Sequence, residues 1–201
     1  MTRMYRLIGI LSRPIFSGLF RLRAEDLEHI PEGGFVLAAN HTSNLDPWAL
    51  GLPLFPKRQL RFMAKSELFN PILGPILNAG GAFPVRRGEG DLEAIRTAVE
   101  LVRAGEIVVM FPEGTRRRKG LRKKFKPRAH TGAARIAIWA KAPLIPAAII
   151  GTDRLRRLGP WLVRYGAPIP VDDLDDQDPA EAAKVATERL MEAIEELRSR
   201  P

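Results

Sequence analysis

FVLAANHTSNLD, residues 35–46, predicts a strand, a loop and the start of a helix in immediate succession. Its first half, Phe35 to Ala39, is an apolar run between a Gly-Gly pair and polar residues, as expected of a short buried strand. The polar half is typical of a loop, in which Asn44 or Asp46 is expected to cap a helix that begins at Pro47. In α/β proteins the carboxyl end of such a strand is a usual place for a ligand site.

His41 and Asp46 lie together in that loop, with four residues between them. A turn therefore brings the carboxylate within reach of one imidazole nitrogen, which fixes the tautomer and leaves the other nitrogen free to accept a proton. Alternatively, Asp46 caps the helix and His41 is an ordinary loop histidine, because both residue types are common in loops. The spacing alone is compatible with both interpretations.

The composition is that of one globular domain with a sizeable core: 201 residues, of which 45% are hydrophobic and 27% charged. The chain has no cysteine, which excludes thiol catalysis, disulfides and cysteine-based zinc sites. Its three histidines form no HExxH motif, which argues against a histidine-rich metal centre. The sequence also lacks GxxxxGK[ST] and GxSxG, so the P-loop and α/β-hydrolase classes are excluded.

The positive charge is concentrated in one stretch, RRRKGLRKKFKPR, residues 116–128. It holds nine basic residues and no acidic one, and the formal net charge of the whole chain is also +9. Such a stretch indicates an anionic partner: a phosphate-bearing substrate, an anionic lipid surface or a nucleic acid. Phe125 is its only aromatic residue, which argues against base stacking, and a merely solvated loop is the remaining alternative.

Residues 4–20, MYRLIGILSRPIFSGLF, are apolar apart from interspersed arginines. The segment is too short and too charged for a membrane span, and no small-residue cleavage site of a signal peptide follows it. An amphipathic helix pair at a membrane surface fits the pattern, and a helix packed on the protein's own core fits it equally well. We expect residues 1–20 to be a membrane-docking helical segment and residues 21–201 to be the main domain.

Strands and helices alternate along the rest of the chain, which indicates an α/β fold with a mixed, largely parallel sheet flanked by helices. Apolar or β-branched runs predict strands within 21–31 and at 35–39, 59–64, 82–86, 107–111, 144–150 and 161–165. Helical periodicity predicts helices at 47–54, 71–78, 92–105, 132–141 and 179–197, with Asp91 and Asp178 as caps of the third and the last. The strand within 21–31 is expected at a sheet edge, and Pro84 indicates an edge or end position for the strand at 82–86.

Polar groups follow several of these strands: His41 with Asp46, Lys65, Arg86 with Arg87, and Glu113 with Arg116. If they share one edge of the sheet, they form a coherent set, a base with its orienting carboxylate and cations that hold a phosphate. Arginine suits phosphate because its planar fork binds two oxygens at once. Taken singly, each arginine is better explained by a surface ion pair.

Four motifs resemble, in their order along the chain, those of the glycerolipid acyltransferases, the lysophosphatidic acid acyltransferase family. NHTSNLD resembles the family's H-x4-D motif, and GGAFPVR at 80–86 resembles G-x-x-F-x-x-R. FPEGTR at 111–116 is similar to the third motif, LIPAAI at 144–149 to the proline-containing fourth, and AKSEL at 64–68 also looks like the family. One motif is weak evidence, whereas four in the family's order over residues 35–151 are strong evidence.

The resemblance implies transfer of a fatty acyl group from acyl-CoA or acyl carrier protein to the sn-2 hydroxyl of 1-acyl-glycerol-3-phosphate, without cofactor or metal. It implies a glycerol-3-phosphate acyltransferase-like fold, with His41 as general base and Asp46 as its orienting partner. An enzyme with this acceptor is expected to work peripherally on an anionic membrane, at the cytoplasmic face. The implied substrate-binding residues are Lys65, Gly80, Phe83, Arg86, Glu113, Gly114, Thr115, Arg116 and Pro146, with Glu113 expected to position Arg116.

Two positions depart from the family pattern. Arg117 replaces the serine that often follows EGTR, and Pro84-Val85 replaces a more usual Ile-Asp in the second motif. Both lie next to the expected acceptor site, so glycerol-3-phosphate or another lysolipid remains an alternative acceptor. Alternatives of another class are a non-catalytic protein that binds anionic lipid and a nucleic-acid-binding protein that uses the basic stretch.

Overall fold

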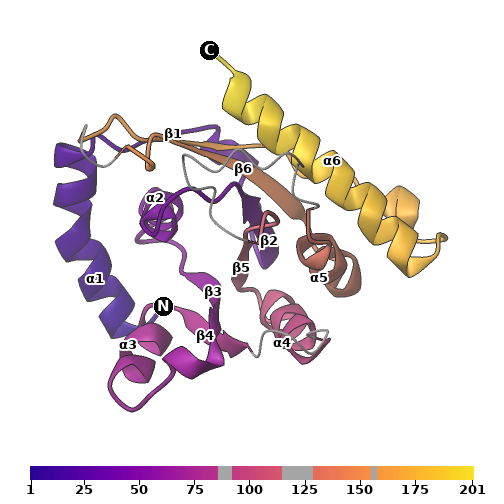
Figure 1. The fold of residues 1–201 in the computed structure, drawn as a ribbon, viewed down its shortest axis with the longest axis horizontal. Helices are drawn as coiled ribbons and strands as arrows, with labels where there is room; N and C mark the ends of the chain where they lie inside the picture. Colours follow the sequence, from indigo (N-terminus) through magenta and orange to yellow (C-terminus); the bar gives the residue numbers. More distant parts are fainter. Residues whose placement is uncertain (86–91, 115–128, 155–157) are drawn as a thin grey trace, which may run out of the picture.

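The computed structural model describes residues 1–85, 92–114, 129–154 and 158–201, which form one seven-stranded sheet with helices on both faces (Figure 1). The strand order is β1-β7-β6-β2-β5-β3-β4, and all neighbours run parallel except β6 and β7. The predicted mixed, largely parallel sheet is therefore confirmed, with β1 and β4 at the edges as expected. The strands are β1 (Arg23–Glu25), β2 (Phe35–Ala39), β3 (Leu60–Lys65), β4 (Ala82–Val85), β5 (Ile107–Met110), β6 (Leu144–Ile150) and β7 (Leu162–Tyr165).

Strand β2 lies in the middle of the sheet and is buried along its whole length, as its continuous apolar sequence predicts. Val36 and Ala38 belong to one hydrophobic core, whereas Phe35, Leu37 and Ala39 belong to a second core on the other face. This division follows from the two-residue period of a strand, in which successive side chains point to opposite faces.

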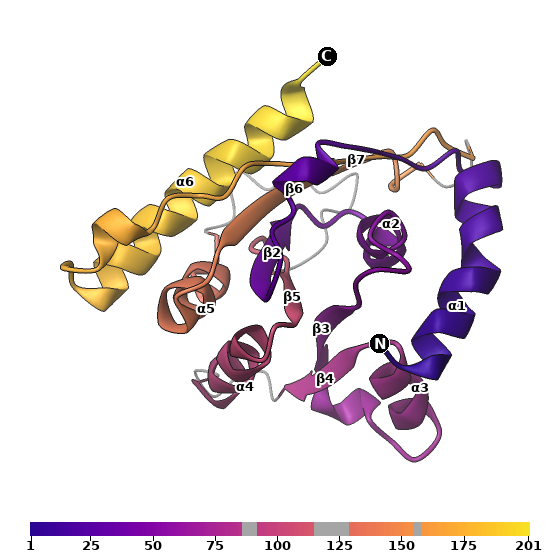
Figure 2. The same cartoon turned by 180° about the vertical axis from the view of Figure 1, so that it is seen from behind.

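Helices α4 (Leu92–Arg103), α5 (Gly132–Ala140) and α6 (Pro179–Ser199) cover the face of the first core. Helix α2 (Asp46–Gly51) covers the other face, and α1 (Arg3–Pro14) lies outside it (Figures 1 and 2). Helix α3 (Leu73–Ala79) lies beside the edge strand β4 and near the start of α1. The predicted cap of α6 is confirmed, since the Asp178 carboxylate accepts from the amides of Ala180 and Glu181. The predicted cap of α4, Asp91, lies outside the described residues.

The predicted cap of α2 is wrong. The helix begins at Asp46, one residue earlier than expected, and its N-cap is Leu45, which makes no side-chain hydrogen bond. The Asp46 carboxylate instead accepts from the amides of Thr42 and Ser43 in the loop before the helix. The side chain therefore orders the loop rather than the first turn of the helix.

The N-terminal segment has one side packed on the domain and one exposed side, and its role at a membrane stays a prediction. The side that faces the domain packs closely, because a Cβ at Gly9 would lie 2.6 Å from the Phe55 ring, and Phe16 in the π-helical turn Ile15–Leu19 is buried. The outward side exposes a row of apolar side chains: Met4, Leu7, Ile10, Leu11, Ile15 and Leu19. Within the described part of the chain, no helix combines the length and the apolar character needed to cross a membrane.

Candidate active site

The carboxyl ends of β2, β5 and β6 lie side by side and carry the candidate site. Ala38 in β2 pairs in parallel register with Met110 of β5 on one side and with Pro146 of β6 on the other. The loops that continue these strands contain His41, Phe111 and Thr152, which all reach the same region. As predicted from the sequence, the H-x4-D loop and the start of the third motif meet at one edge of the sheet.

Asp46 is fully buried and holds His41 through a short hydrogen bond, with 2.8 Å between His41 Nδ1 and Asp46 Oδ2. The same oxygen accepts the amide hydrogens of Thr42 at 2.7 Å and Ser43 at 2.9 Å, and Oδ1 accepts the Thr152 hydroxyl at 2.6 Å. An ionised carboxylate only accepts hydrogen bonds, so Nδ1 of His41 must be the donor. The lone pair of the neutral ring is then at Nε2, which is the nitrogen able to take a proton.

Asn40 fixes the position of this loop against the neighbouring strand. Its side-chain amide donates to the carbonyl of Ile149 at 2.9 Å, and its side-chain oxygen accepts from the amide of Ile149 at 2.7 Å. The buried side chain thus extends the pairing of β2 with β6 by one step after the backbone has turned away. The residue before His41 is therefore fixed by its bonds to β6, and the strand before it is paired with both β5 and β6.

The third motif begins under the histidine ring. The rings of His41 and Phe111 are stacked, with centroids 4.1 Å apart and planes inclined by 18°. Glu113 is buried, and Gly114 adopts a positive φ of 67° as its amide donates to the Phe111 carbonyl at 2.9 Å. The positive φ favours glycine at this turn, and a Cβ at Gly114 would lie 2.5 Å from His130 Nε2, at the end of an exposed side chain.

The other predicted substrate-binding residues are not gathered around His41. Phe83 is buried in the core between β4 and α4, with β5 and β3 between β4 and β2 in the sheet. Gly80 ends α3 and precedes β4, so it lies toward the amino ends of the parallel strands, away from the site. Pro146 is buried within β6. Arg86, Thr115, Arg116, the basic stretch and the side chain of Lys65 lie outside the described residues, so their roles remain predictions.

Pro146 is tolerated in an inner strand because the pairing of β6 with β7 ends beside it. The last pair of that ladder joins Ala147 to Tyr165, so Pro146, which has no amide hydrogen, stands at the end of the ladder rather than within it. Its carbonyl accepts from the Gly166 amide at 2.8 Å, and a Cβ at Gly166 would lie 2.7 Å from the proline ring. The proline of the fourth motif therefore has a structural explanation in this sheet.

Tyr165 fixes the position of α2, the helix that begins at Asp46, through a hydrogen bond. Its fully buried hydroxyl donates to the carbonyl of Leu50 at 2.8 Å, and Leu50 is in the helix that Asp46 begins. Burial raises the pKa of Tyr165 above its ordinary value of 10.0, with a smaller contribution from Tyr5. The hydroxyl therefore stays protonated as a donor throughout the neutral range.

Sequence reasoning missed Thr152, Asn40 and the ring contact of Phe111. The signal for Thr152 was present, because Gly151-Thr152 directly follow the strand that carries the fourth motif. The rule that selected His41, a polar group at the carboxyl end of a central strand, also selects Thr152. Among the residues that the structure describes, no three His, Asp or Glu side chains gather as they would to hold a metal ion.

Comparisons with known proteins show the family to which the chain belongs. The acyltransferase family profile matches residues 21–150 of the chain. The 1-acyl-sn-glycerol-3-phosphate acyltransferase of Bacillus subtilis (strain 168) is 33% identical over 202 residues, 98% of either chain. The protein of the same name from Streptococcus pneumoniae is 31% identical over 145 residues, 70% of this chain and 52% of that protein.

The fold is also found in a solved structure. The crystal structure of the 1-acyl-sn-glycerophosphate acyltransferase PlsC from Thermotoga maritima matches with a TM-score of 0.66 and 27% identity. The match covers 98% of this chain and 79% of that one. The chain therefore belongs to the glycerolipid acyltransferase family and is an enzyme of the 1-acyl-sn-glycerol-3-phosphate acyltransferase type.

Proposed function

We propose that this enzyme transfers a fatty acyl group from acyl-CoA or acyl carrier protein to the sn-2 hydroxyl of 1-acyl-sn-glycerol-3-phosphate. The product is phosphatidic acid, an intermediate of phospholipid synthesis. The observation that carries the proposal is the 2.8 Å contact between His41 and the buried carboxylate of Asp46. The names of the similar proteins from B. subtilis and S. pneumoniae support the lysophospholipid as acceptor.

The reaction follows from the tautomer of His41. Nε2 takes the proton of the acceptor hydroxyl while the oxygen attacks the thioester carbonyl, and Asp46 stabilises the imidazolium that forms. Collapse of the tetrahedral intermediate forms the ester and expels the thiolate, which takes the proton back from His41. The acyl group passes directly from donor to acceptor, in accord with a chain that has no cysteine and no GxSxG serine. We propose that no metal or prosthetic group takes part.

The acceptor phosphate is assigned to the end of β5 and the loop that continues it. Glu113 and Gly114 bring the chain to the same edge as His41, and Arg116 follows two residues later in the sequence. An arginine at that point would bind phosphate oxygens bidentately, and Arg86 would add a second cation. These two roles, and those of Lys65 and Thr115, rest on the motifs.

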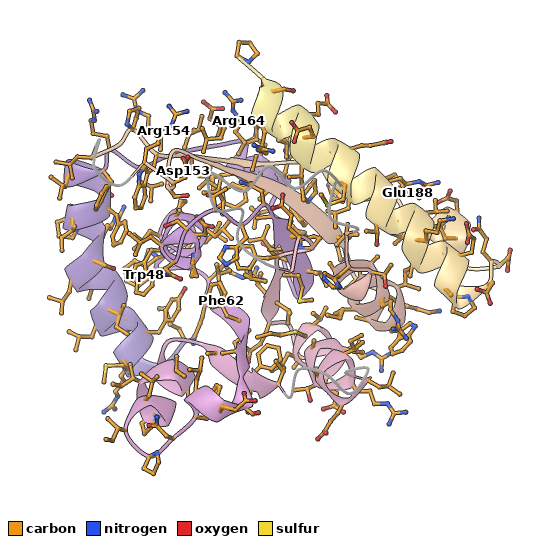
Figure 3. All side chains as sticks on the ribbon, viewed as in Figure 1. Trp48, Phe62, Asp153, Arg154, Arg164 and Glu188 are labelled. Atoms are coloured by element: carbon orange, nitrogen blue, oxygen red, sulfur yellow. The ribbon has the colours of Figure 1, made fainter. Side chains whose placement is uncertain are left out.

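The exposed apolar row of α1 is proposed as the part that docks on the membrane. Arg3, Arg6 and Arg13 are exposed on the same short helix, so it offers apolar side chains for the acyl boundary and cations for anionic headgroups. Trp48, labelled in Figure 3, belongs to α2, and its ring stacks on that of Phe16 with centroids 6.3 Å apart. The contact joins the N-terminal segment to the helix that Asp46 begins. The proposed location is peripheral, on the cytoplasmic face of the cell membrane.

The test is thiol release from acyl-CoA in the presence of 1-acyl-sn-glycerol-3-phosphate. Release is expected only with acceptor present and is expected to be abolished in His41→Ala. The matched control is His29→Gln, because the Nδ1 of His29 lies 2.8 Å from the Tyr165 carbonyl, outside the site, and glutamine retains a donor. Glycerol-3-phosphate and other lysolipids, compared in the same assay, decide the acceptor.

Acyl carrier protein thioesters replace acyl-CoA if the intact enzyme releases no thiol. Absence of thiol release with both donors would overturn the proposed reaction and leave non-catalytic lipid or nucleic-acid binding as the alternatives. Turnover that survives His41→Ala would leave the acyltransferase in place but refute the role of the base.

A further inference from the structure

Thr152 lies at the end of β6 and is completely buried, although it is polar and follows a glycine in a turn. Its hydroxyl is 2.6 Å from Asp46 Oδ1 and 3.0 Å from the hydroxyl of Thr42. Asp46 and Thr152 are 106 positions apart in the sequence. The contact therefore ties the fourth-motif strand directly to the carboxylate that holds His41.

The direction of these hydrogen bonds follows from the number of hydrogens available. An ionised carboxylate cannot donate, so the single hydroxyl hydrogen of Thr152 goes to Asp46 Oδ1. The bond between the two hydroxyls must then use the hydrogen of Thr42, with Thr152 as acceptor. The result is a directed chain, Thr42 to Thr152 to Asp46, in which each bond polarises the next.

The two oxygens of Asp46 are held from different sides. Oδ2 receives three donors from its own loop, which are His41 Nδ1 and the amides of Thr42 and Ser43. Oδ1 receives the hydroxyl of Thr152 from the neighbouring strand. Rotation about the Cβ–Cγ bond moves both oxygens, so it would break the three bonds at Oδ2 and the bond from Thr152 at Oδ1 together. The Thr152 bond therefore adds a restraint from the neighbouring strand to those that the loop supplies.

The backbone at the end of β6 is built to place this hydroxyl. Gly151 has a positive φ of 91°, and a Cβ there would lie 2.5 Å from the carbonyl of Pro160. Only glycine allows the chain to turn at that point, and the turn directs Thr152 inward. The pairing of Asn40 with Ile149 fixes the same two segments one step earlier.

We propose that Thr152 is a positioning residue for the acyl transfer: by holding Oδ1 it adds to the restraint on the rotation of Asp46, and thereby on the tautomer and orientation of His41. This inference rests on the proposed base role of His41. Thr152 itself touches neither substrate, and its effect passes through the carboxylate. Thr42 is the second member of the same chain, and its hydroxyl holds Thr152 in the donating orientation.

The experiment compares three variants of the full chain. Thr152→Val keeps the shape and removes the hydroxyl, whereas Thr152→Ser keeps the hydroxyl. Thr187→Val is the matched control, because the buried Thr187 hydroxyl donates to the Ala183 carbonyl at 2.6 Å within α6, away from the site. Each variant is measured for kcat, for KM of donor and acceptor, and for its melting temperature.

We expect kcat of Thr152→Val to fall by about 10- to 100-fold with both KM values unchanged, by analogy with the loss of a residue that orients a metal-bound histidine. Thr152→Ser should recover most of the rate. Thr187→Val should lower the melting temperature about as much as Thr152→Val does, without an effect on kcat. Wild-type kcat in Thr152→Val, or an equal loss of kcat in Thr187→Val, would overturn the proposal.

A second readout does not depend on turnover. The chain has three histidines, so ¹⁵N NMR of histidine-labelled protein resolves each ring. His41 is expected as the Nδ1–H tautomer in the wild type and Thr152→Ser, and as a mixture in Thr152→Val, with His29 unchanged in all. An unchanged His41 spectrum in Thr152→Val would refute the positioning role even if the assay of the proposed function had failed.

Discussion

The ring of His41 lies flat against the ring of Phe111, with centroids 4.1 Å apart and planes inclined by 18°. The contact joins the loop after β2 to the residue after β5, and these two strands are neighbours in the sheet. Asp46 holds the edge of the imidazole at Nδ1, and Phe111 covers one of its faces. The histidine is therefore restrained in both tilt and rotation before any substrate binds.

Loss of this stacking should reduce the rate without abolishing it. Phe111→Leu is expected to lower kcat by up to about tenfold, because an aromatic pair contributes about 0.5–1.5 kcal/mol beyond its burial. Phe62→Leu is the matched control, since Phe62 is partly buried against the same hydrophobic core. Equal kcat values for the two variants would show that the ring contact does not serve His41.

Asp46→Asn should impair both catalysis and stability. The amide is nearly isosteric, but its NH2 group faces hydrogens that the carboxylate accepted, and it cannot orient an Nδ1–H donor in the same way. We expect kcat to fall by about 10³- to 10⁴-fold, as in other histidine–aspartate pairs, and the free energy of unfolding to fall by about 1–3 kcal/mol.

Asp178→Asn is the control for Asp46→Asn, because asparagine caps a helix as well as aspartate does and Asp178 caps α6. Steady-state kinetics and urea unfolding measure the two effects. Retention of full activity in Asp46→Asn would contradict the orienting role of the carboxylate.

Gly114→Ala tests the turn of the third motif. A non-glycine residue at a φ of 67° costs about 1–2 kcal/mol, and the added Cβ would lie 2.5 Å from His130 Nε2. We expect a lower melting temperature and lower kcat in the single variant. In a His130→Ala background the loss of stability should be smaller, because the clash is gone and the backbone strain remains. Equal losses in both backgrounds would exclude the clash.

Tyr165 should make the protein sensitive to alkali. Burial raises its folded-state pKa above 10.0, so above pH 10 the unfolded chain loses this proton and the folded chain keeps it. The contribution of Tyr165 to the free energy of unfolding is therefore fully present below pH 10. At higher pH it falls by about 1.4 kcal/mol per pH unit.

In Tyr165→Phe the alkaline slope should be shallower by that amount, although the lost bond to Leu50 lowers stability at every pH. Urea unfolding between pH 8 and pH 11 measures both. Tyr5→Phe is a useful comparison, because burial also raises the pKa of Tyr5. Parallel curves for the wild type and Tyr165→Phe would contradict the prediction.

Leu11→Glu tests the docking row of α1. Leu11 is 63% exposed, so the change should leave the melting temperature within a degree or two. Binding to anionic vesicles should weaken by about 10- to 100-fold, the equivalent of one leucine side chain no longer buried in the membrane. Leu92→Glu is the control, since Leu92 is 41% exposed on α4, which covers the opposite face of the sheet. Vesicle co-sedimentation that falls equally in both variants would rule out a specific docking row.

Local patterns in the sequence were enough for the strands, most helices and the two members of the dyad. The apolar run of β2, the N-cap of α6 at Asp178 and the edge position of β4, which contains Pro84, all follow from rules that act over a few residues. The pairing of His41 with Asp46 also lies within reach of local reasoning, because one turn spans it.

The tertiary structure alone decided which oxygens and rings complete the site. Thr152 reaches Asp46 from 106 positions away, Asn40 reaches Ile149 from 109 positions away, and Asp46 turns toward its loop rather than capping α2. The same holds for α1, whose sequence allowed either packing or exposure and whose two sides show one each. Such contacts depend on the register of parallel strands, which is set by the packing of the whole sheet and leaves no pattern in any one segment.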